Sequence, residues 1–235
     1  MNTSKLLVET VANYSDSNSM GSKFRSKRIV PLIKMIEKAY EVHGKVDIID
    51  IGGRKTYWNI LPMDVLSRYR VMITIVNLPD ASEQGDNQYE DEKHFCFQFG
   101  DGGNLSCFSD NTFQIVHANS VIEHVGDWFN MVKFAKEVSR IAPTIFIQTP
   151  YFWFPIEPHF MTLFFHWLPR PIRIWFLLHF DLGSHPRSLT LHEAAGKLEN
   201  YRLLDRQMFQ ALFPDAQIVS EKFLGLTKSL IAVRS

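Results

Sequence analysis

Polar residues and glycines follow directly after four apolar runs in the first half of the chain. They are Asp50, Gly52 and Gly53, then Asn77, then Asp101 and Gly102, and finally Asn119. If the runs are parallel strands, their carboxyl ends meet at one edge of a sheet, where ligands bind in such proteins. Ordinary turn chemistry does not predict a full set of this kind. The pattern indicates a site for a nucleotide-like cofactor.

The loop after the first run reads DIGGRKT, with Gly52 and Gly53 followed by Arg54, Lys55 and Thr56. A glycine lets the backbone approach a ligand closely because it has no Cβ. A pyrophosphate-binding loop has the pattern G-x-G-x-x-G, which this loop lacks. The loop therefore disfavours an NAD-linked oxidoreductase.

A second set of chemically capable side chains lies in the segment FPIEPH. Its prolines stiffen the loop, and Glu157 and His159 stand two residues apart, so both can face one pocket. A paired Glu157 would orient the imidazole of His159 while His159 takes a proton from a reacting hydroxyl. The alternative is that both side chains satisfy local backbone groups. His124 is a third candidate, at the start of a helix that borders the cofactor.

Metal binding is not expected from the spacing of possible ligands. The other histidines lack the spacing of metal ligands, and Cys96 and Cys107 are too few for a CxxC metal site or a disulfide framework. The sequence therefore predicts no metal. With no signal-peptide pattern at the N-terminus, it predicts a cytoplasmic protein.

The elements that position these residues follow from the apolar patterning. Strands are expected over residues 46–51, 71–77, about 95–101, 113–118, 143–150, 216–223 and 227–234. Helices are expected over residues 28–43, 127–141 (capped by Asp127) and 205–214. Strands that alternate with helices predict a doubly wound α/β fold with right-handed crossovers. The whole chain is expected to form one domain, with a loose lead-in over residues 1–26 and an aromatic-rich insertion over residues 151–188.

The insertion contains an apolar stretch over residues 160–180, interrupted by Pro169, Arg170, Pro171 and Arg173. The interruption predicts two short lid helices rather than a membrane span. An interfacial helix that touches a membrane surface is the alternative. The many aromatic side chains of the insertion would wall a substrate pocket or fill the core of the lid.

Charge does not point to nucleic acid as a partner. Lys plus Arg and Asp plus Glu number 25 each, so the formal net charge is zero. The basic stretch over residues 22–28 is expected to be a solvated arm.

The segment FQFGDGGNLSCFSDNTFQIVHANSVIEHVGDW, from Phe97 to Trp128, resembles class I S-adenosylmethionine-dependent methyltransferases of the type 11 group. The shared features are a Gly-Asp pair, a short loop containing Leu, a strand and an SVIEH-like turn into a helix. The final segment, residues 203–234, is similar to the closing helix and β-hairpin of that family. The resemblance covers residues 46–150 and 203–234.

The resemblance implies a Rossmann-like methyltransferase fold, with a seven-stranded, mostly parallel sheet and a C-terminal antiparallel hairpin. It also implies S-adenosylmethionine as cofactor and methyl transfer, most directly at oxygen, to a small-molecule, glycan or lipid-linked acceptor. Asp50 would lie near the amino group of the cofactor, Asp101 and Gly102 at the adenine, and Asn119 at the methionine part. For Asp101 and Gly102, the alternative is an ordinary turn.

Two departures from the family pattern matter. Asn77 stands where the family has an acidic residue that takes both ribose hydroxyls, and an amide loses the charge-assisted bidentate bond. Arg54 and Thr56 replace the later glycines of the opening loop, although a cofactor without phosphates does not need a phosphate cradle. These departures leave open a catalytically inactive methyltransferase-like domain that serves as a binding or scaffold partner.

Overall fold

The centre of the protein is a seven-stranded sheet. The computed structural model describes residues 20–62, 64–79 and 93–235. The strands are β1 (Val46–Ile51), β2 (Val71–Asn77), β3 (Phe95–Phe99), β4 (Ile115–Asn119), β5 (Thr144–Pro150), β8 (Gln217–Phe223) and β9 (Leu226–Arg234). Their order is β3-β2-β1-β4-β5-β9-β8, and only the β5–β9 and β8–β9 pairs are antiparallel. The expected doubly wound, mostly parallel sheet with a C-terminal hairpin is therefore confirmed.

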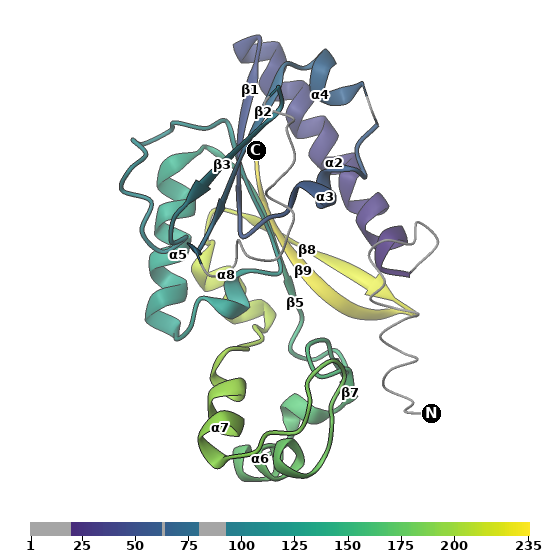
Figure 1. Ribbon diagram of the computed structural model, residues 1–235. Helices are drawn as coiled ribbons and strands as arrows, with labels where there is room; N and C mark the ends of the chain where they lie inside the picture. The colour runs from purple at the N-terminus through teal and green to yellow at the C-terminus, as the bar shows by residue number, and fades with distance from the viewer. Residues whose placement is uncertain (1–19, 63, 80–92) are drawn as a thin grey trace.

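Helices cover both faces of this sheet and form three layers (Figure 1). On one face lie α2 (Met20–His43), α3 (Lys55–Trp58) and α4 (Val65–Arg68), which pack apolar side chains such as Leu32 and Trp58 onto β1 and β2. On the other face lie α5 (Trp128–Ile141) and α8 (Arg206–Leu212). The inner strands read as apolar runs because both of their faces are buried.

Helix α5 shows how local sequence sets an element boundary. Asp127 has extended backbone angles, and its side chain accepts a hydrogen bond of 2.9 Å from the backbone N–H of Asn130. This bond satisfies one of the free donors of the first turn. The predicted cap is confirmed, and its position fixes the loop that leads from β4 into the helix.

Helix α2 begins earlier than its sequence pattern suggests. It starts at Met20, so residues 20–26 of the expected lead-in are helical, and residues 1–19 lie outside the described residues. Pro31 stands inside the helix. The expected acidic loop after β2 falls mostly on residues 80–92, which also lie outside the described residues.

The insertion forms a small separate layer beyond the carboxyl end of β5 (Figure 1). It contains β6 (Ile156–Glu157), β7 (Thr162–Leu163), the 3-10 turn η4 (Phe165–Trp167) and helix α6 (Arg170–His179). Helix α7 (Leu191–Glu199) shares its apolar core, so the packed unit extends past residue 188. We call residues 151–199 the lid.

The two helices expected over residues 160–180 are one helix and one 3-10 turn. Pro169 is the N-cap of α6 and Pro171 lies in its first turn, where a proline is tolerated because its missing N–H would have no helical partner. The prolines therefore start a helix rather than separate two helices. Within the described ranges, no helix has both the length and the apolar character needed to cross a bilayer.

Candidate functional site

The loop after β1 requires both of its glycines. Gly52 has a φ of +68°, and a Cβ on it would lie 2.7 Å from a methyl group of Val121. A Cβ on Gly53 would lie 1.8 Å from a carboxylate oxygen of Asp50. A side chain at either position would therefore displace the loop, because real Cβ atoms do not approach other atoms so closely.

Asp50 lies where the sequence predicts, at the end of β1, but it is fully buried. One of its carboxylate oxygens accepts a 2.8 Å hydrogen bond from the indole N–H of Trp58, and the other lies 2.6 Å from His117 Nδ1. The described bonds of Asp50 are thus to protein groups. These bonds tie the end of β1 to Trp58 of α3 and His117 of β4, and the expected contact of Asp50 with a cofactor stays a prediction.

The ends of β2 and β3 lie beside this loop. The amide NH₂ of Asn77 donates a 2.9 Å hydrogen bond to the carbonyl of Gly53, which ties β2 to the loop after β1. Asp101 is exposed and accepts a 2.8 Å bond from the N–H of Gly103, as in an Asx turn. A Cβ on Gly102 would lie 2.8 Å from Ile51. Strands β3, β2, β1 and β4 are neighbours, so the predicted residues do meet at one edge.

Asn119, at the end of β4, has a partner that the sequence pattern did not reveal. Its side-chain oxygen accepts a 2.5 Å hydrogen bond from Arg28, which also pairs with both carboxylate oxygens of Glu221 at 2.5 and 2.6 Å. Arg28 is only 7% exposed. The expectation of a solvated arm is wrong for Arg28, because its guanidinium reaches two groups from distant parts of the chain.

The pair expected in the FPIEPH segment is present. His159 Nδ1 lies 2.7 Å from Glu157 Oε1, and the backbone N–H of Phe160 donates a 2.5 Å bond to Glu157 Oε2. Both oxygens of the buried Glu157 are thus engaged. Glu157 is in position to orient the imidazole, as the sequence suggested, and the ring of His159 stacks on Tyr201 with centroids 4.2 Å apart.

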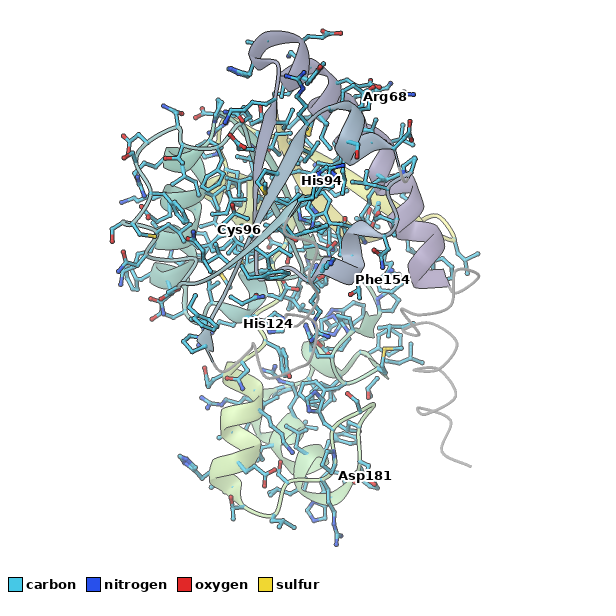
Figure 2. The ribbon with its side chains drawn as sticks, turned by 45° about the horizontal axis from the view of Figure 1, so that its top comes forward. Arg68, His94, Cys96, His124, Phe154 and Asp181 are labelled. Carbon is cyan, nitrogen blue, oxygen red and sulfur yellow. The ribbon has the colours of Figure 1, made fainter. Side chains whose placement is uncertain are left out.

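His124 lies close to this pair. It ends the 3-10 turn η3 (Ile122–His124) after β4, and its ring centroid lies 4.9 Å from that of His159. Its Nδ1 lies 3.2 Å from the carbonyl of Asn200. Partial desolvation of the ring, whose side chain is 39% exposed, and then the nearby His159 lower the pKa of His124 to about 4. Figure 2 shows His124 at the junction between the sheet and the lid.

Glu123 is a member of this cluster that the sequence reading did not select. It is fully buried, and its Oε2 accepts a 3.0 Å hydrogen bond from the hydroxyl of Thr149. Burial raises its pKa to about 7. Ligand-capable atoms of Glu123, His124 and His159 lie within 4.8 Å of one another. The sequence places Glu123 after the fourth strand without giving it a role, and only the fold shows that β5 and the lid surround it.

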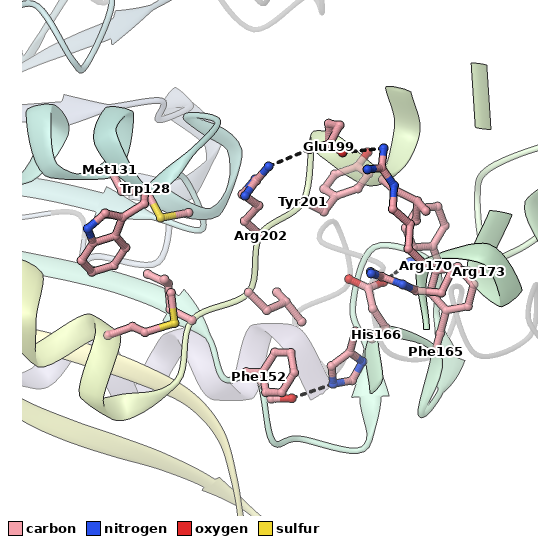
Figure 3. Close-up of a pocket in the computed structure, with 16 residues that line it drawn as sticks. Trp128, Met131, Phe152, Phe165, His166, Arg170, Arg173, Glu199, Tyr201 and Arg202 are labelled. Carbon is pink, nitrogen blue, oxygen red and sulfur yellow. Dashed lines mark hydrogen bonds and ion pairs between the residues drawn. The ribbon is translucent and has the colours of Figure 1, made fainter. Parts of the chain in front are cut away.

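A cavity of about 340 Å³ lies between the lid and helices α5 and α8. Trp128 and Met131 lie on one side, and Phe165, Arg170 and Arg173 on the other (Figure 3). Its lining also includes Glu157 and Tyr201, both in contact with His159. The cavity and the cluster are therefore adjacent.

No family model and no curated protein matches this chain. Solved structures do. The PH0226 protein from Pyrococcus horikoshii OT3 is 15% identical with a TM-score of 0.55, over 98% of each chain. The CurJ carbon methyltransferase is 13% identical with a TM-score of 0.50, over 81% of this chain and 48% of that one. An O-methyltransferase family protein from Burkholderia thailandensis is 17% identical with a TM-score of 0.47, over 94% of this chain and 64% of that one.

This chain thus spans less than two thirds of the length of the two methyltransferases. At such identities the similarity is one of fold. It agrees with the strand order and with the antiparallel strand β9 beside β5. The chain has the Rossmann-like fold of the class I S-adenosylmethionine-dependent methyltransferases.

Proposed function

We propose that this protein is an S-adenosylmethionine-dependent methyltransferase that acts on an oxygen of a small-molecule, glycan or lipid-linked acceptor. The observation that carries the proposal is the set of contacts made by the segment after β4. Val121 packs against Gly52 in the expected cofactor loop, and Glu123 and His124, directly after it, contact the Glu157–His159 region. One short segment thus joins a cofactor edge to a cluster able to activate a hydroxyl.

The residues at the strand ends fit this cofactor. Gly52 and Gly53 bring bare backbone to the edge of the sheet, and S-adenosylmethionine has no phosphates that would require a longer glycine loop. The amide oxygen of Asn77 can accept a ribose hydroxyl. The exposed carboxylate of Asp101 can accept from the adenine amine, beside the backbone of Gly102. Asn119, held by Arg28, can donate to the methionine part through its NH₂ group.

When bound, S-adenosylmethionine would supply the methyl group and would leave as S-adenosylhomocysteine. The protein has to align the acceptor and remove its proton. His159 Nε2 would take the hydroxyl proton, since Nδ1 is held by Glu157. The adjacent cavity would hold the rest of the acceptor, with aromatic side chains that suit a sugar face or a lipid chain.

The exposed apolar side chains of the lid support a lipid-linked acceptor. Ile172, Trp175 and Phe180 are 43, 50 and 47% exposed along α6 and just after it. Such a surface can lie against the interface of a bilayer. Pelleting with liposomes tests this part of the proposal; a chain that stays in the supernatant contradicts it and leaves a water-soluble acceptor.

An inactive binding or scaffold domain is the second candidate. It is favoured by Asn77, whose amide cannot make the charge-assisted ribose bond and is already tied to Gly53. Calorimetry with S-adenosylhomocysteine separates the two candidates. Binding, followed by methyl transfer from labelled S-adenosylmethionine to a panel of hydroxyl acceptors, supports the enzyme. No binding at millimolar ligand rules the enzyme out.

A further inference from the structure

We propose that Glu123, His124 and His159 form a binding site for a divalent transition-metal cation. The site would hold an oxygen of the acceptor, and this second part rests on the proposed methyltransferase function. The sequence predicted no metal, from the spacing of the other histidines and the number of cysteines, and it did not consider these three residues together. The fold brings them together from η3 and from the loop after β6.

The donor atoms are close enough for one ion. They lie within 4.8 Å of one another, and His124 Nε2 is 4.0 Å from Glu123 Oε1. Two ligands bonded to zinc at about 2.1 Å lie about 3.4 Å apart at the tetrahedral angle. Rotamer adjustments of about 1 Å would bring the donor atoms to this spacing. The side chain of His124 is 39% exposed, which leaves room for such an adjustment.

Glu123 supplies the second, independent observation. Its Oε1 is buried and has no hydrogen-bond partner within the part of the chain that the structure describes. A buried carboxylate oxygen is unfavourable unless it is paired, hydrogen-bonded or bound to a metal. The other oxygen is fixed by Thr149, so Oε1 is held toward His124. A cation between them would remove this unsatisfied group.

The histidines are also held as metal ligands usually are. The Nδ1 of His159 bonds to the carboxylate of Glu157, and the Nδ1 of His124 bonds to the carbonyl of Asn200. Each bond fixes the tautomer with hydrogen on Nδ1 and leaves the Nε2 lone pair to coordinate. Such carboxylate–histidine and carbonyl–histidine contacts are typical of metal sites and strengthen the ligand. Glu157 would then be a positioning residue.

The donor set indicates the kind of cation and its role. Two imidazoles and one carboxylate suit Zn²⁺, Co²⁺ and related ions better than Mg²⁺ or Ca²⁺. Three protein ligands leave at least one coordination position open, as in catalytic zinc sites. An acceptor hydroxyl bound there would release its proton to water, because a bound cation lowers the pKa of a ligated oxygen. The cation would then replace His159 as the activating group.

The test uses the full chain, stripped with EDTA and freed of the chelator. Co²⁺ is added while its visible absorption is followed, and Zn²⁺ binding is measured by calorimetry. We expect one equivalent per chain, with a Co²⁺ spectrum of nitrogen and oxygen ligands. S-adenosylhomocysteine binding is measured in the same preparation, so that the cofactor site is scored separately.

Variants locate the bound ion. Glu123→Gln keeps the shape of the side chain, and with His124→Ala and His159→Ala it is expected to lower Co²⁺ affinity tenfold or more. Glu157→Gln should lower it about 10- to 100-fold through the orientation of His159. His43→Ala, at an exposed histidine at the end of α2, is the matched control and should bind as the unaltered chain does. Circular dichroism and thermal melting confirm that each variant is folded.

Some results would overturn the proposal. A folded chain that binds S-adenosylhomocysteine but neither Co²⁺ nor Zn²⁺ has no such site. The same holds if folded Glu123→Gln and His124→Ala both keep full metal affinity, or if only His43→Ala loses it. If the chain binds the metal but not S-adenosylhomocysteine, the result supports the metal site and contradicts the proposed methyltransferase function.

Discussion

Arg28 and Asn119 lie far apart in the sequence, yet Arg28 donates a 2.5 Å hydrogen bond to the side chain of Asn119. Arg28 belongs to the N-terminal helix, and Asn119 ends the fourth strand. The same guanidinium holds Glu221 on the C-terminal hairpin, which also accepts a hydrogen bond from Ser229. The first helix, the centre of the sheet and the last strands are thus tied together at the expected methionine end of the cofactor site.

Replacing Arg28 should therefore destabilise the protein. Arg28→Gln leaves Glu221 without its buried partner, and breaking a buried ion pair in this way costs about 3 to 5 kcal/mol. The measurement is urea unfolding. The matched control is Arg68→Gln, whose pair with Asp64 is 64 and 59% exposed and should contribute little to stability. Equal unfolding midpoints for the two variants would show that the Arg28 network adds no net stability.

The placement of the adenine can be tested at Asp101. Asp101→Ala should weaken S-adenosylhomocysteine binding by about 1.5 to 3 kcal/mol, the usual range for a lost hydrogen bond to a charged group. Calorimetry gives the affinity directly. Asp215→Ala removes another exposed carboxylate, remote from the strand ends, and should leave the affinity unchanged. If Asp101→Ala also binds normally, the adenine lies elsewhere.

Substitutions at Gly52 and Gly44 distinguish the cost of backbone strain from the cost of a steric clash. Both have positive φ values, +68° and +69°, but only at Gly52 would a Cβ meet another side chain. Gly44→Ala should cost about 1 to 2 kcal/mol from the left-handed backbone alone. Gly52→Ala should lower the free energy of unfolding by more than this. It should also weaken S-adenosylhomocysteine binding, because the new Cβ would push the loop away from Val121. Both free energies of unfolding come from chemical denaturation.

A double variant checks the steric part of this prediction. Val121→Ala removes the methyl groups that the new Cβ would strike. Gly52→Ala combined with Val121→Ala should therefore lose less stability than the sum of the single variants. Strict additivity would argue against the contact as the cause.

Glu137 should make stability depend on pH in the acid range. Its pKa lies below the usual 4.5, first because Arg140 donates hydrogen bonds to it, and the N–H of Leu105 donates another of 2.6 Å. Because the folded-state pKa is lowered, this stabilisation is fully present above pH 4.5 and is lost as pH falls through the lowered pKa.

Glu137→Gln should therefore be less stable than the unaltered chain at pH 7, by about 1 to 3 kcal/mol, and the difference should shrink below pH 4.5. Thermal melts at a series of pH values measure this. Glu41→Gln, at an exposed position of α2, is the control and should show little difference at any pH. If the stability difference between Glu137→Gln and the unaltered chain stays constant down to pH 3, the lowered pKa of Glu137 is contradicted.

The sequence by itself determined the sheet and the edge at which its chemistry lies. β1 and β2 were predicted with the bounds they have, and the Asp127 cap of α5 was predicted correctly, because apolar periodicity and capping are local properties. The pairing of Glu157 with His159 was also accessible, since Pro158 stands between them and restricts how the two side chains can point. Other boundaries differed: α2 begins at Met20 rather than at residue 28, and the prolines expected to separate two lid helices stand at the start of α6.

Only the tertiary structure decided which distant groups share a site. The contacts of Arg28 with Asn119 and Glu221, and of Glu123 and His124 with His159, join segments that leave no joint pattern along the chain. Burial decided the rest. Asp50 was expected near the amino group of a cofactor but is enclosed by Trp58 and His117, and Glu123, to which the sequence analysis gave no role, is a buried carboxylate with an unpaired oxygen in the described structure. Periodicity records which face of an element is apolar, whereas proximity between elements depends on how the layers pack around them.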